Sequence, residues 1–357
     1  MRDEEQSTIE VLFAPDYTQY NPYQARLKQE LAELGVEVQL SSGLSPGKLR
    51  ELADADEGVL HLHWLFPYFQ SETRIGLTRR AFWFSVKLLY LKFAGVQLVW
   101  TAHDYITHSR ENEQFSKRFR RMIFRLFDSV VVHCEAAKDR LHREYNFSRD
   151  YSDRMTTIVH PHFLDYPNTI ERDAARERLQ LEHDDKVFLF FGNIKQYKGV
   201  DELIDAFQRL EDEDAQLFIA GSTTEKTEDQ VMRAVEADPR ISGDFRFVPT
   251  DEIQFYLNAA DVVVLPFRDI LTSGSVVLAM SFGKPVIAPA IGCIPETVTD
   301  GGAFLYDPES ADGLYDALRA TEEHDLAAMG ERNREHIEQF DWLTAARETK
   351  EVYESGN

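Results

Sequence analysis

The chain alternates short, continuous apolar runs with longer segments in which apolar residues recur every three or four positions. Continuous apolar runs are typical of parallel strands that are buried on both faces. The longer amphipathic segments predict the helices that connect such strands. The sequence therefore predicts an α/β protein with doubly wound, mainly parallel sheets. The strands are expected at residues 9–15, 36–40, 58–64, 97–101, 129–133, 157–160, 186–191, 216–220, 245–249, 262–265 and 286–288.

The clearest strand–helix–strand unit lies at residues 261–296, DVVVLPFRDILTSGSVVLAMSFGKPVIAPAIGCIPE. Ser273, Gly274 and Ser275 open its helix with the small and hydroxyl residues that an N-cap requires. Free backbone N–H groups and the positive end of the helix dipole make such a turn a candidate anion site. An ordinary helix cap is the alternative interpretation of the same residues.

The segments D-V-V-V-L-P, S-G-S-V-V-L-A-M-S-F-G-K-P-V-I-A and G-C-I-P-E-T-V resemble the donor-sugar half of family 4 glycosyltransferases. That resemblance implies the GT-B fold, two facing Rossmann-like domains with parallel sheets and a C-terminal helix that crosses back to the first domain. We expect an acceptor-side domain at 1–165, a nucleotide-sugar-binding domain at 166–338 and the returning helix at 339–357.

A second segment of the same half, GNIKQYKG at 192–199, resembles the family loop G-R-x-x-x-x-K-G. Gly192 and Lys198 match the pattern, and Lys198 is expected to neutralise the donor diphosphate. Asn193 stands where the family has arginine, so we expect Lys195 to supply the missing charge. Solvated loop lysines are the alternative.

The family's retaining members carry two glutamates eight positions apart, one by the donor sugar and one on the ribose. Ile270 and Leu278 occupy these positions, which is the largest departure from the family pattern. We expect Asp269 to act as the replacement carboxylate, although it could simply end a strand. Glu296 matches a glutamate in the family's G-x-P-E segment and is assigned to the nucleotide-binding side.

In the first half, V-W-T-A-H-D resembles the family step at which a histidine meets the donor sugar, so His103 is expected to orient that sugar. Tyr20 and Asn21, in the loop after the first strand, are expected to form an aromatic acceptor platform or, equally, a packed surface loop. His63 follows a strand, where α/β sites form, and is expected on the acceptor side. It shares a face with His61, but no third metal ligand follows, so no metal is expected.

The charge balance limits the partners. Lys and Arg total 39 against 62 Asp and Glu, a net charge of −23, which argues against nucleic acid as the main partner. This acidic surface suits a protein from a high-salt source. Two cysteines are too few for a zinc site built from cysteines.

Two segments, 74–93 and 115–127, reverse this charge pattern, because basic and aromatic residues recur in both at helical spacing. Such helices suit contact with an anionic lipid surface. Crossover helices with solvated cations are the alternative. No secretory signal and no apolar run of spanning length are apparent, so we expect a cytoplasmic protein, peripheral at the inner face of the membrane.

These features together predict a glycosyltransferase of the EC 2.4 type. It would move a sugar from a nucleotide donor to a hydroxyl on a lipid-linked or polysaccharide intermediate, without a metal or other cofactor. The resemblance implies retention of configuration. The alternatives are a non-catalytic sugar- or membrane-binding relative and a nucleotide-sugar 2-epimerase on the same fold.

Overall fold

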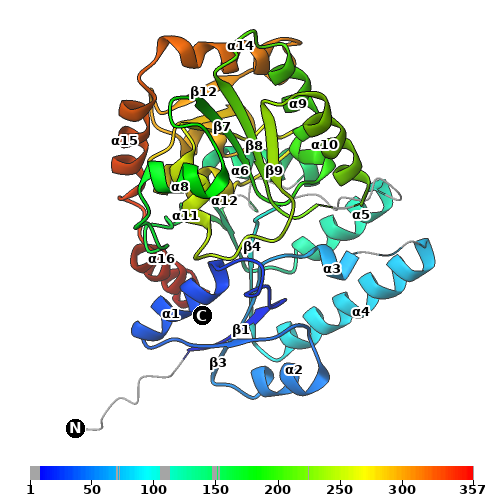
Figure 1. Cartoon of the computed structure of the whole chain (residues 1–357). Helices are drawn as coiled ribbons and strands as arrows, with labels where there is room; N and C mark the ends of the chain where they lie inside the picture. The colour runs from blue at the N-terminus through cyan, green and yellow to red at the C-terminus, as the bar shows by residue number, and fades with distance from the viewer. Residues whose placement is uncertain are drawn as a thin grey trace. The chain divides into compact units, whose positions relative to one another are not determined.

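The computed structural model describes residues 9–69, 71, 73–104, 113–146, 151, 153–223 and 225–356 (Figure 1). By its contacts the chain divides into two compact units. Unit 1 comprises residues 1–160 and 340–357, and unit 2 comprises residues 161–339. The sequence-based boundaries at 165/166 and 338/339 lie within a few residues of these changeovers.

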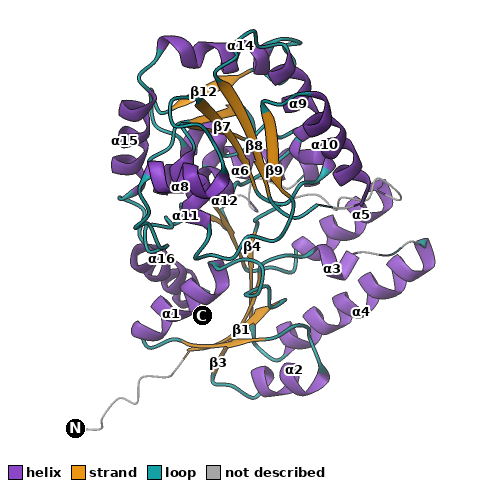
Figure 2. Cartoon of the chain, viewed as in Figure 1, coloured by secondary structure: helices purple, strands orange, loops and turns teal. Residues whose placement is uncertain are grey.

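Unit 1 contains a parallel six-stranded sheet in the order β2-β1-β3-β4-β5-β6, flanked by helices (Figure 2). Its strands are β1 (Ile9–Ala14), β2 (Glu37–Leu40), β3 (Glu57–Leu62), β4 (Gln97–Thr101), β5 (Ser129–Val132) and β6 (Met155–Thr157). Its described helices are α1 (Tyr23–Glu33), α2 (Pro46–Ala53), α3 (Phe66–Phe69), α4 (Arg74–Phe93), α5 (Glu113–Phe124), α6 (Glu135–Tyr145) and α16 (Trp342–Glu354).

Unit 2 repeats the plan with a parallel sheet in the order β12-β11-β10-β7-β8-β9. Its strands are β7 (Lys186–Phe191), β8 (Ala215–Ala220), β9 (Ile241–Asp244), β10 (Val262–Val264), β11 (Val286–Pro289) and β12 (Ala303–Tyr306). The helical segments are α8 (Arg172–Leu179), η1 (Gln196–Lys198), α9 (Val200–Gln208), α10 (Glu225–Ala237), α11 (Ile253–Ala259), α12 (Gly274–Ser281), α13 (Ile294–Thr297), α14 (Gly313–Ala320), η2 (Thr321–Glu323) and α15 (Leu326–Ile337).

Both sheets are doubly wound, because the chain leaves the first strand of each unit toward one edge and later returns to its other side. The first strand β1 lies between β2 and β3, and β7 lies between β8 and β10. Ligands of such sheets bind at the carboxyl ends of the strands, where the winding direction changes. The predicted pair of Rossmann-like units is confirmed.

The C-terminal helix α16 belongs to unit 1, although unit 2 precedes it in the chain. The Tyr353 hydroxyl lies 2.6 Å from Nδ1 of the buried His61, and the Gln97 amide donates to the Val352 carbonyl at 2.9 Å. The predicted return of the last helix to the first domain is thereby confirmed.

The strand predicted at 245–249 is wrong. Strand β9 ends at Asp244, and the following residues form a loop. The aromatic and β-branched residues of F-R-F-V-P favour a strand, but Pro249 has no N–H to give to a sheet. Arg246 instead pairs with Asp244 and Glu252, and these ion pairs hold the loop in place.

Candidate functional site

In unit 2 the loops after β7 and β10 meet at the carboxyl edge of the sheet. These two strands are neighbours at the point where the winding direction changes. The loop after β7 carries Gly192 and Lys198, and the loop after β10 leads into α12. The sequence therefore folds the two motifs expected to bind phosphate onto adjacent strands.

The Lys198 ammonium lies beside the backbone of the glycine turn. Gly192 has a φ of +128°, and a Cβ added there would lie 2.9 Å from Lys198 Nζ and 3.5 Å from Ser275 Oγ. A side chain at position 192 would thus occupy the space between the ammonium and the start of α12. Glycine keeps this space open.

Further close backbone approaches fix the two loops. Gly199 has a φ of +67°, and a Cβ there would lie 2.1 Å from the Pro266 carbonyl oxygen. Gly221, after β8, has a φ of +139°, and a Cβ there would lie 2.1 Å from the Gly192 carbonyl oxygen. Only glycine fits these positions, so the glycines determine where Lys198 stands.

Helix α12 starts as the sequence predicted. Ser273 is its N-cap, and its hydroxyl accepts the Val276 N–H at 3.3 Å. The N–H groups of Gly274 and Ser275 precede the first intrahelical hydrogen bond, so the positive end of the helix dipole opens at this point. A helix start with an ammonium group beside it is an anion-binding arrangement.

Lys198 is poised for an anionic ligand. Burial, assisted by the charge of Lys195, lowers the pKa of its ammonium to about 8. Only 9 % of Lys198 is exposed, whereas Lys195 is exposed. Placing a cation in an apolar setting is unfavourable unless a negative group compensates it, and a diphosphate supplies that charge.

Arg268, which the sequence analysis missed, ties the two loops together. Its guanidinium donates to the Gln196 carbonyl at 2.7 Å and pairs with Asp201 at 2.6 Å and Glu202 at 2.8 Å. These partners belong to η1 and α9, while Arg268 follows β10. The sequence signal for it was an arginine four positions after the last residue of β10.

The remaining predicted donor-side residues are Asn193, Asp269 and Glu296. Asn193 is exposed, and its side-chain oxygen accepts the Ser222 hydroxyl at 2.5 Å. Asp269 is half-buried in the loop before α12, and Glu296 is exposed in the short helix α13. Their assignments to the donor site stay predictions.

In unit 1 the carboxyl ends of adjacent strands carry histidines. His63 follows β3, His103 follows β4, His133 follows β5 and His160 lies beyond β6. Nδ1 of His63 lies 3.1 Å from Nε2 of His103, and Nδ1 of His103 lies 3.3 Å from Nε2 of His133. The structure thus brings the two predicted histidines into direct contact.

The other members of this histidine cluster were missed, although each lies at the end of a predicted strand. Tyr23 packs edge-on against His63, His103, His133 and His160, with ring centroids 4.7–5.8 Å apart. The signal was the recurrence of histidine after successive apolar runs.

The predicted aromatic platform continues outward from His103. The His103 ring stacks on Trp64 at 4.6 Å, and Trp64 packs edge-on against Tyr17 at 5.1 Å. Tyr17 neighbours Tyr20, which is 73 % exposed. Asn21 accepts the Tyr23 N–H and shapes this loop. Its acceptor role stays a prediction.

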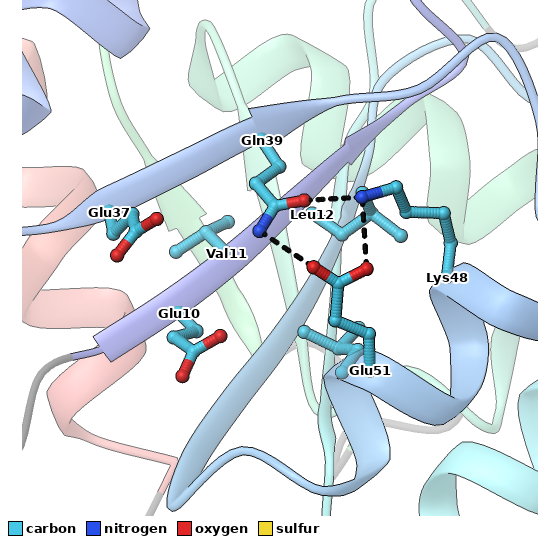
Figure 3. A pocket seen from close by; sticks show the side chains of 8 residues that line it. Glu10, Val11, Leu12, Glu37, Gln39, Lys48 and Glu51 are labelled. Carbon is cyan, nitrogen blue, oxygen red and sulfur yellow. Dashed lines mark hydrogen bonds and ion pairs between the residues drawn. The ribbon is translucent and has the colours of Figure 1, made fainter.

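A shallow hollow over β1, β2 and α2 offers no comparable chemistry (Figure 3). Lys48 Nζ contacts Gln39 at 2.7 Å and Glu51 at 2.9 Å, and Gln39 donates to Glu51 at 3.2 Å. These three polar side chains pair with one another, and the other polar groups that line the hollow are the carboxylates of Glu10 and Glu37, so its one cation, Lys48, is not left for an anionic ligand.

The described residues contain neither a metal-binding cluster nor a membrane-spanning helix. No cluster of three or more histidine, cysteine or acidic side chains there could hold a metal ion. Within the same residues, no helix has both the length and the apolar character needed to cross a membrane.

The two basic segments differ in structure. On α5 and the turn after it, Lys117 pairs with Glu144 at 2.6 Å, the buried Arg120 donates to the Tyr145 hydroxyl and Arg121 donates to the Asn146 carbonyl. These cations therefore anchor the helix to α6.

Helix α4 instead has apolar residues on two opposite faces. One face is buried in unit 1, and the other is a stripe that includes Phe82 at 56 % and Phe93 at 89 % exposure. Together with those two, the exposed stripe consists of Ile75, Trp83, Val86, Leu89 and Tyr90.

Two parallel, doubly wound units, one with an anion cradle at its strand edge, define a GT-B glycosyltransferase. Family models agree: residues 22–161 match Glycosyltransferase Family 4, and residues 171–337 match Glycosyl transferases group 1. The chain belongs to family 4 of the glycosyltransferases.

Among its relatives is a GDP-mannose:glycolipid 4-beta-D-mannosyltransferase of Xanthomonas campestris, 27 % identical over 94 % of this chain and 91 % of that protein. A D-inositol 3-phosphate glycosyltransferase of Streptomyces bingchenggensis is 30 % identical over 63 % of this chain and 52 % of its own length.

Solved structures share the fold. The HepE protein of Anabaena in complex with UDP has a TM-score of 0.73 at 17 % identity, covering 98 % of this chain and all of its own. A sucrose-phosphate synthase of Thermosynechococcus elongatus has a TM-score of 0.74 at 16 % identity, covering 98 % of both chains.

Proposed function

We propose that this glycosyltransferase moves a mannosyl group from a guanosine diphosphate donor to a hydroxyl of a lipid-linked glycan. The observation that carries the proposal is the buried Lys198 ammonium beside the start of α12, at the strand edge where α/β folds bind ligands. The donor sugar follows the Xanthomonas relative, whose name specifies GDP-mannose and a glycolipid.

Catalysis at the cradle is electrostatic. The diphosphate leaves with additional negative charge, which Lys198, Lys195 and the first amides of α12 would stabilise. These groups need no metal ion for this role. Asp269 and His103 would contact the sugar, Asp269 as the replacement for the carboxylate lost at Ile270.

Retention and inversion of the anomeric configuration are supported by different observations. The family resemblance implies retention, but Ile270 and Leu278 remove both family glutamates. The Xanthomonas relative is named a 4-beta-D-mannosyltransferase, and a β-linked product from an α-linked donor would be inversion. The anomeric configuration of the product, read by NMR, separates the two.

The acceptor side of the proposal uses α4. By helical geometry Arg79 lies within the exposed apolar stripe and Arg80 and Lys87 lie along one edge of it, and the helix contains no acidic residue. An apolar stripe with basic neighbours suits the surface of an anionic bilayer. We therefore assign α4, rather than α5, to peripheral membrane contact on the side where a lipid-linked acceptor would arrive.

The first experiment is calorimetric binding of GDP, UDP, ADP and their sugar conjugates, at low and high salt because the net charge is −23. We expect one base to bind. Lys198→Met should weaken that binding roughly 100-fold, because a charge-assisted contact to the diphosphate is lost.

Lys284→Met is the matched control. Burial also lowers the pKa of Lys284 to about 8, but its ammonium donates to the Ala260 carbonyl at 2.9 Å. It should keep nucleotide binding. If no nucleotide binds at either salt concentration, the donor site is refuted and a non-catalytic relative becomes the better assignment.

The stability of Lys198→Met against urea is a second test, independent of the binding measurement. The pKa of Lys198 lies below the ordinary lysine value, so the empty site destabilises the fold at pH 7, by about 3 kcal/mol for a change from 10.5 to about 8. Lys198→Met should therefore stabilise the free protein against urea and, at the same time, lower its affinity for the nucleotide.

Co-sedimentation with vesicles tests the membrane contact. Anionic phosphatidylglycerol vesicles should bind the protein, and pure phosphatidylcholine should not. Phe82→Gln with Phe93→Gln should abolish binding, whereas Met122→Gln with Met232→Gln, which removes exposed apolar groups from α5 and α10, should preserve it. Equal binding by both double variants would rule out α4.

A further inference from the structure

Four adjacent strands of unit 1 end in a continuous line of hydrogen-bonding groups. His63 follows β3, His103 follows β4, His133 follows β5 and Ile158 follows β6. The strands lie side by side in the order β3-β4-β5-β6, so these residues succeed one another along the carboxyl edge. We call this line of three imidazoles and one carbonyl the histidine ladder.

The ladder has a fixed direction, which one backbone group determines. The Ile158 carbonyl oxygen lies 2.8 Å from Nδ1 of His133, and a carbonyl can only accept. His133 therefore carries its proton on Nδ1. A neutral imidazole has one donor and one acceptor nitrogen, so Nε2 of His133 must accept.

The same rule applies to His103 and His63. Nδ1 of His103 lies 3.3 Å from Nε2 of His133, so His103 donates through Nδ1. Its Nε2 is then the acceptor, and Nδ1 of His63 donates to it at 3.1 Å. All three rings are thereby assigned the Nδ1–H tautomer.

The assignment requires neutral rings, and the surroundings support that. Burial lowers the pKa of His133 to about 3, and burial together with neighbouring histidines lowers the pKa of His63 and His103. Among the described residues, the titratable rings that pack against the three histidines are those of His61, His160 and Tyr23, the last fully buried.

The ladder ends in an acceptor. Nε2 of His63 is buried and has no hydrogen-bond partner among the described residues. Buried polar atoms without a partner are uncommon in folded proteins and call for a water or ligand donor. Among the described residues, the Ile158 carbonyl is therefore the group that sets the direction of the ladder.

We propose that His133 is a positioning residue that holds His103 in one neutral tautomer, with its lone pair on Nε2. On the proposed function, His103 then meets a sugar hydroxyl as an acceptor and never as a donor at that nitrogen. The ligand hydroxyl must supply the hydrogen, in place of the one that His63 gives in the free protein.

Nitrogen-15 NMR of histidine-labelled full-length protein tests the ladder directly, because protonated and bare ring nitrogens have well-separated shifts. We expect Nδ1–H and bare Nε2 for His63, His103 and His133. An Nε2–H tautomer at His103 would overturn the proposal. This measurement does not depend on transferase activity.

Two substitutions at His133 test the positioning. His133→Leu removes both hydrogen bonds, so His103 should populate both tautomers, and kcat should fall roughly 10- to 100-fold with little change in donor KM. His133→Gln keeps an N–H for the Ile158 carbonyl and an oxygen for His103, so it should restore the tautomer and most of kcat.

The outcomes separate the two proposals. Equal loss of kcat and of melting temperature in both variants would reduce His133 to a structural role. An unchanged His103 tautomer in His133→Leu would also refute the positioning. If the tautomers are as expected but no sugar is transferred, the proposed function fails while the fixed tautomer remains.

Discussion

The two units end their parallel sheets in opposite chemistry. The edge of unit 2 presents charge, with Lys198 beside the positive start of α12. The edge of unit 1 presents neutral imidazoles and aromatic rings centred on His103 and Tyr23. On the proposed function, one edge would receive an anion and the other uncharged hydroxyl groups.

The largest effect is expected from Gly199→Ala. The substitution strains a left-handed backbone and places a Cβ 2.1 Å from the Pro266 carbonyl oxygen. We expect a loss of more than about 3 kcal/mol in the free energy of unfolding, with loss of nucleotide binding. Urea denaturation and calorimetry measure the two quantities.

Gly283→Ala is the matched control for that substitution. Gly283 has a similar φ of +64°, but the nearest atom to an added Cβ is 3.6 Å away. It should cost about 1 kcal/mol of backbone strain and leave nucleotide affinity intact. Equal effects of the two alanines would show that the contact with Pro266 does not shape the cradle.

A smaller effect is expected in unit 1 from Tyr353→Phe. The buried His61 contacts the Tyr353 hydroxyl through Nδ1 and the Thr101 hydroxyl through Nε2. Removing one partner leaves a buried nitrogen unpaired, so the free energy of unfolding should fall by about 1–3 kcal/mol.

Tyr23→Phe is the control for this substitution. Among the described residues, no hydrogen bond to the Tyr23 hydroxyl is observed, and phenylalanine would keep the ring packing. It should change stability by less than Tyr353→Phe. A loss of similar size would assign the stability of this edge to the rings rather than to the His61 bonds.

The sequence predicted the charged edge better than the neutral one, for a physical reason. The anion cradle consists mainly of local motifs, since Gly192, Lys198 and Gly199 lie within eight residues, and Ser273, Gly274 and Ser275 open α12 within three. Their geometry follows from neighbouring backbone, so a sequence pattern can carry it. The sequence analysis missed Arg268 because its partners on α9 are more than sixty residues away along the chain.

The histidine ladder could not be predicted in this way. It requires the alignment of four strands whose residues lie nearly a hundred positions apart, from His63 to Ile158. Sequence patterns located the four strands, although β6 was expected at 157–160 and lies at Met155–Thr157, but they did not give the order of the strands in the sheet. The sequence also could not distinguish the roles of α4 and α5. That distinction depends on Glu144 and Tyr145 of α6, which pair with the α5 cations.

The pH dependence of donor binding should distinguish the two edges. A nucleotide sugar has no ionising terminal phosphate, so between pH 6 and 9 the change should come from Lys198, whose pKa is about 8 in the free protein. A bound diphosphate favours the charged ammonium, so binding takes up a proton above pH 8 and affinity should fall by up to tenfold per pH unit, or about 1.4 kcal/mol. Below pH 8 affinity should be flat, because the pKa values of His103 and His63 are far below this range.

The control is Lys198→Arg, which stays charged throughout and should remove the alkaline fall in affinity. A wild-type affinity that instead changes near pH 6.5 would mean that the histidine edge titrates, and the contrast between a charged and a neutral edge would be lost.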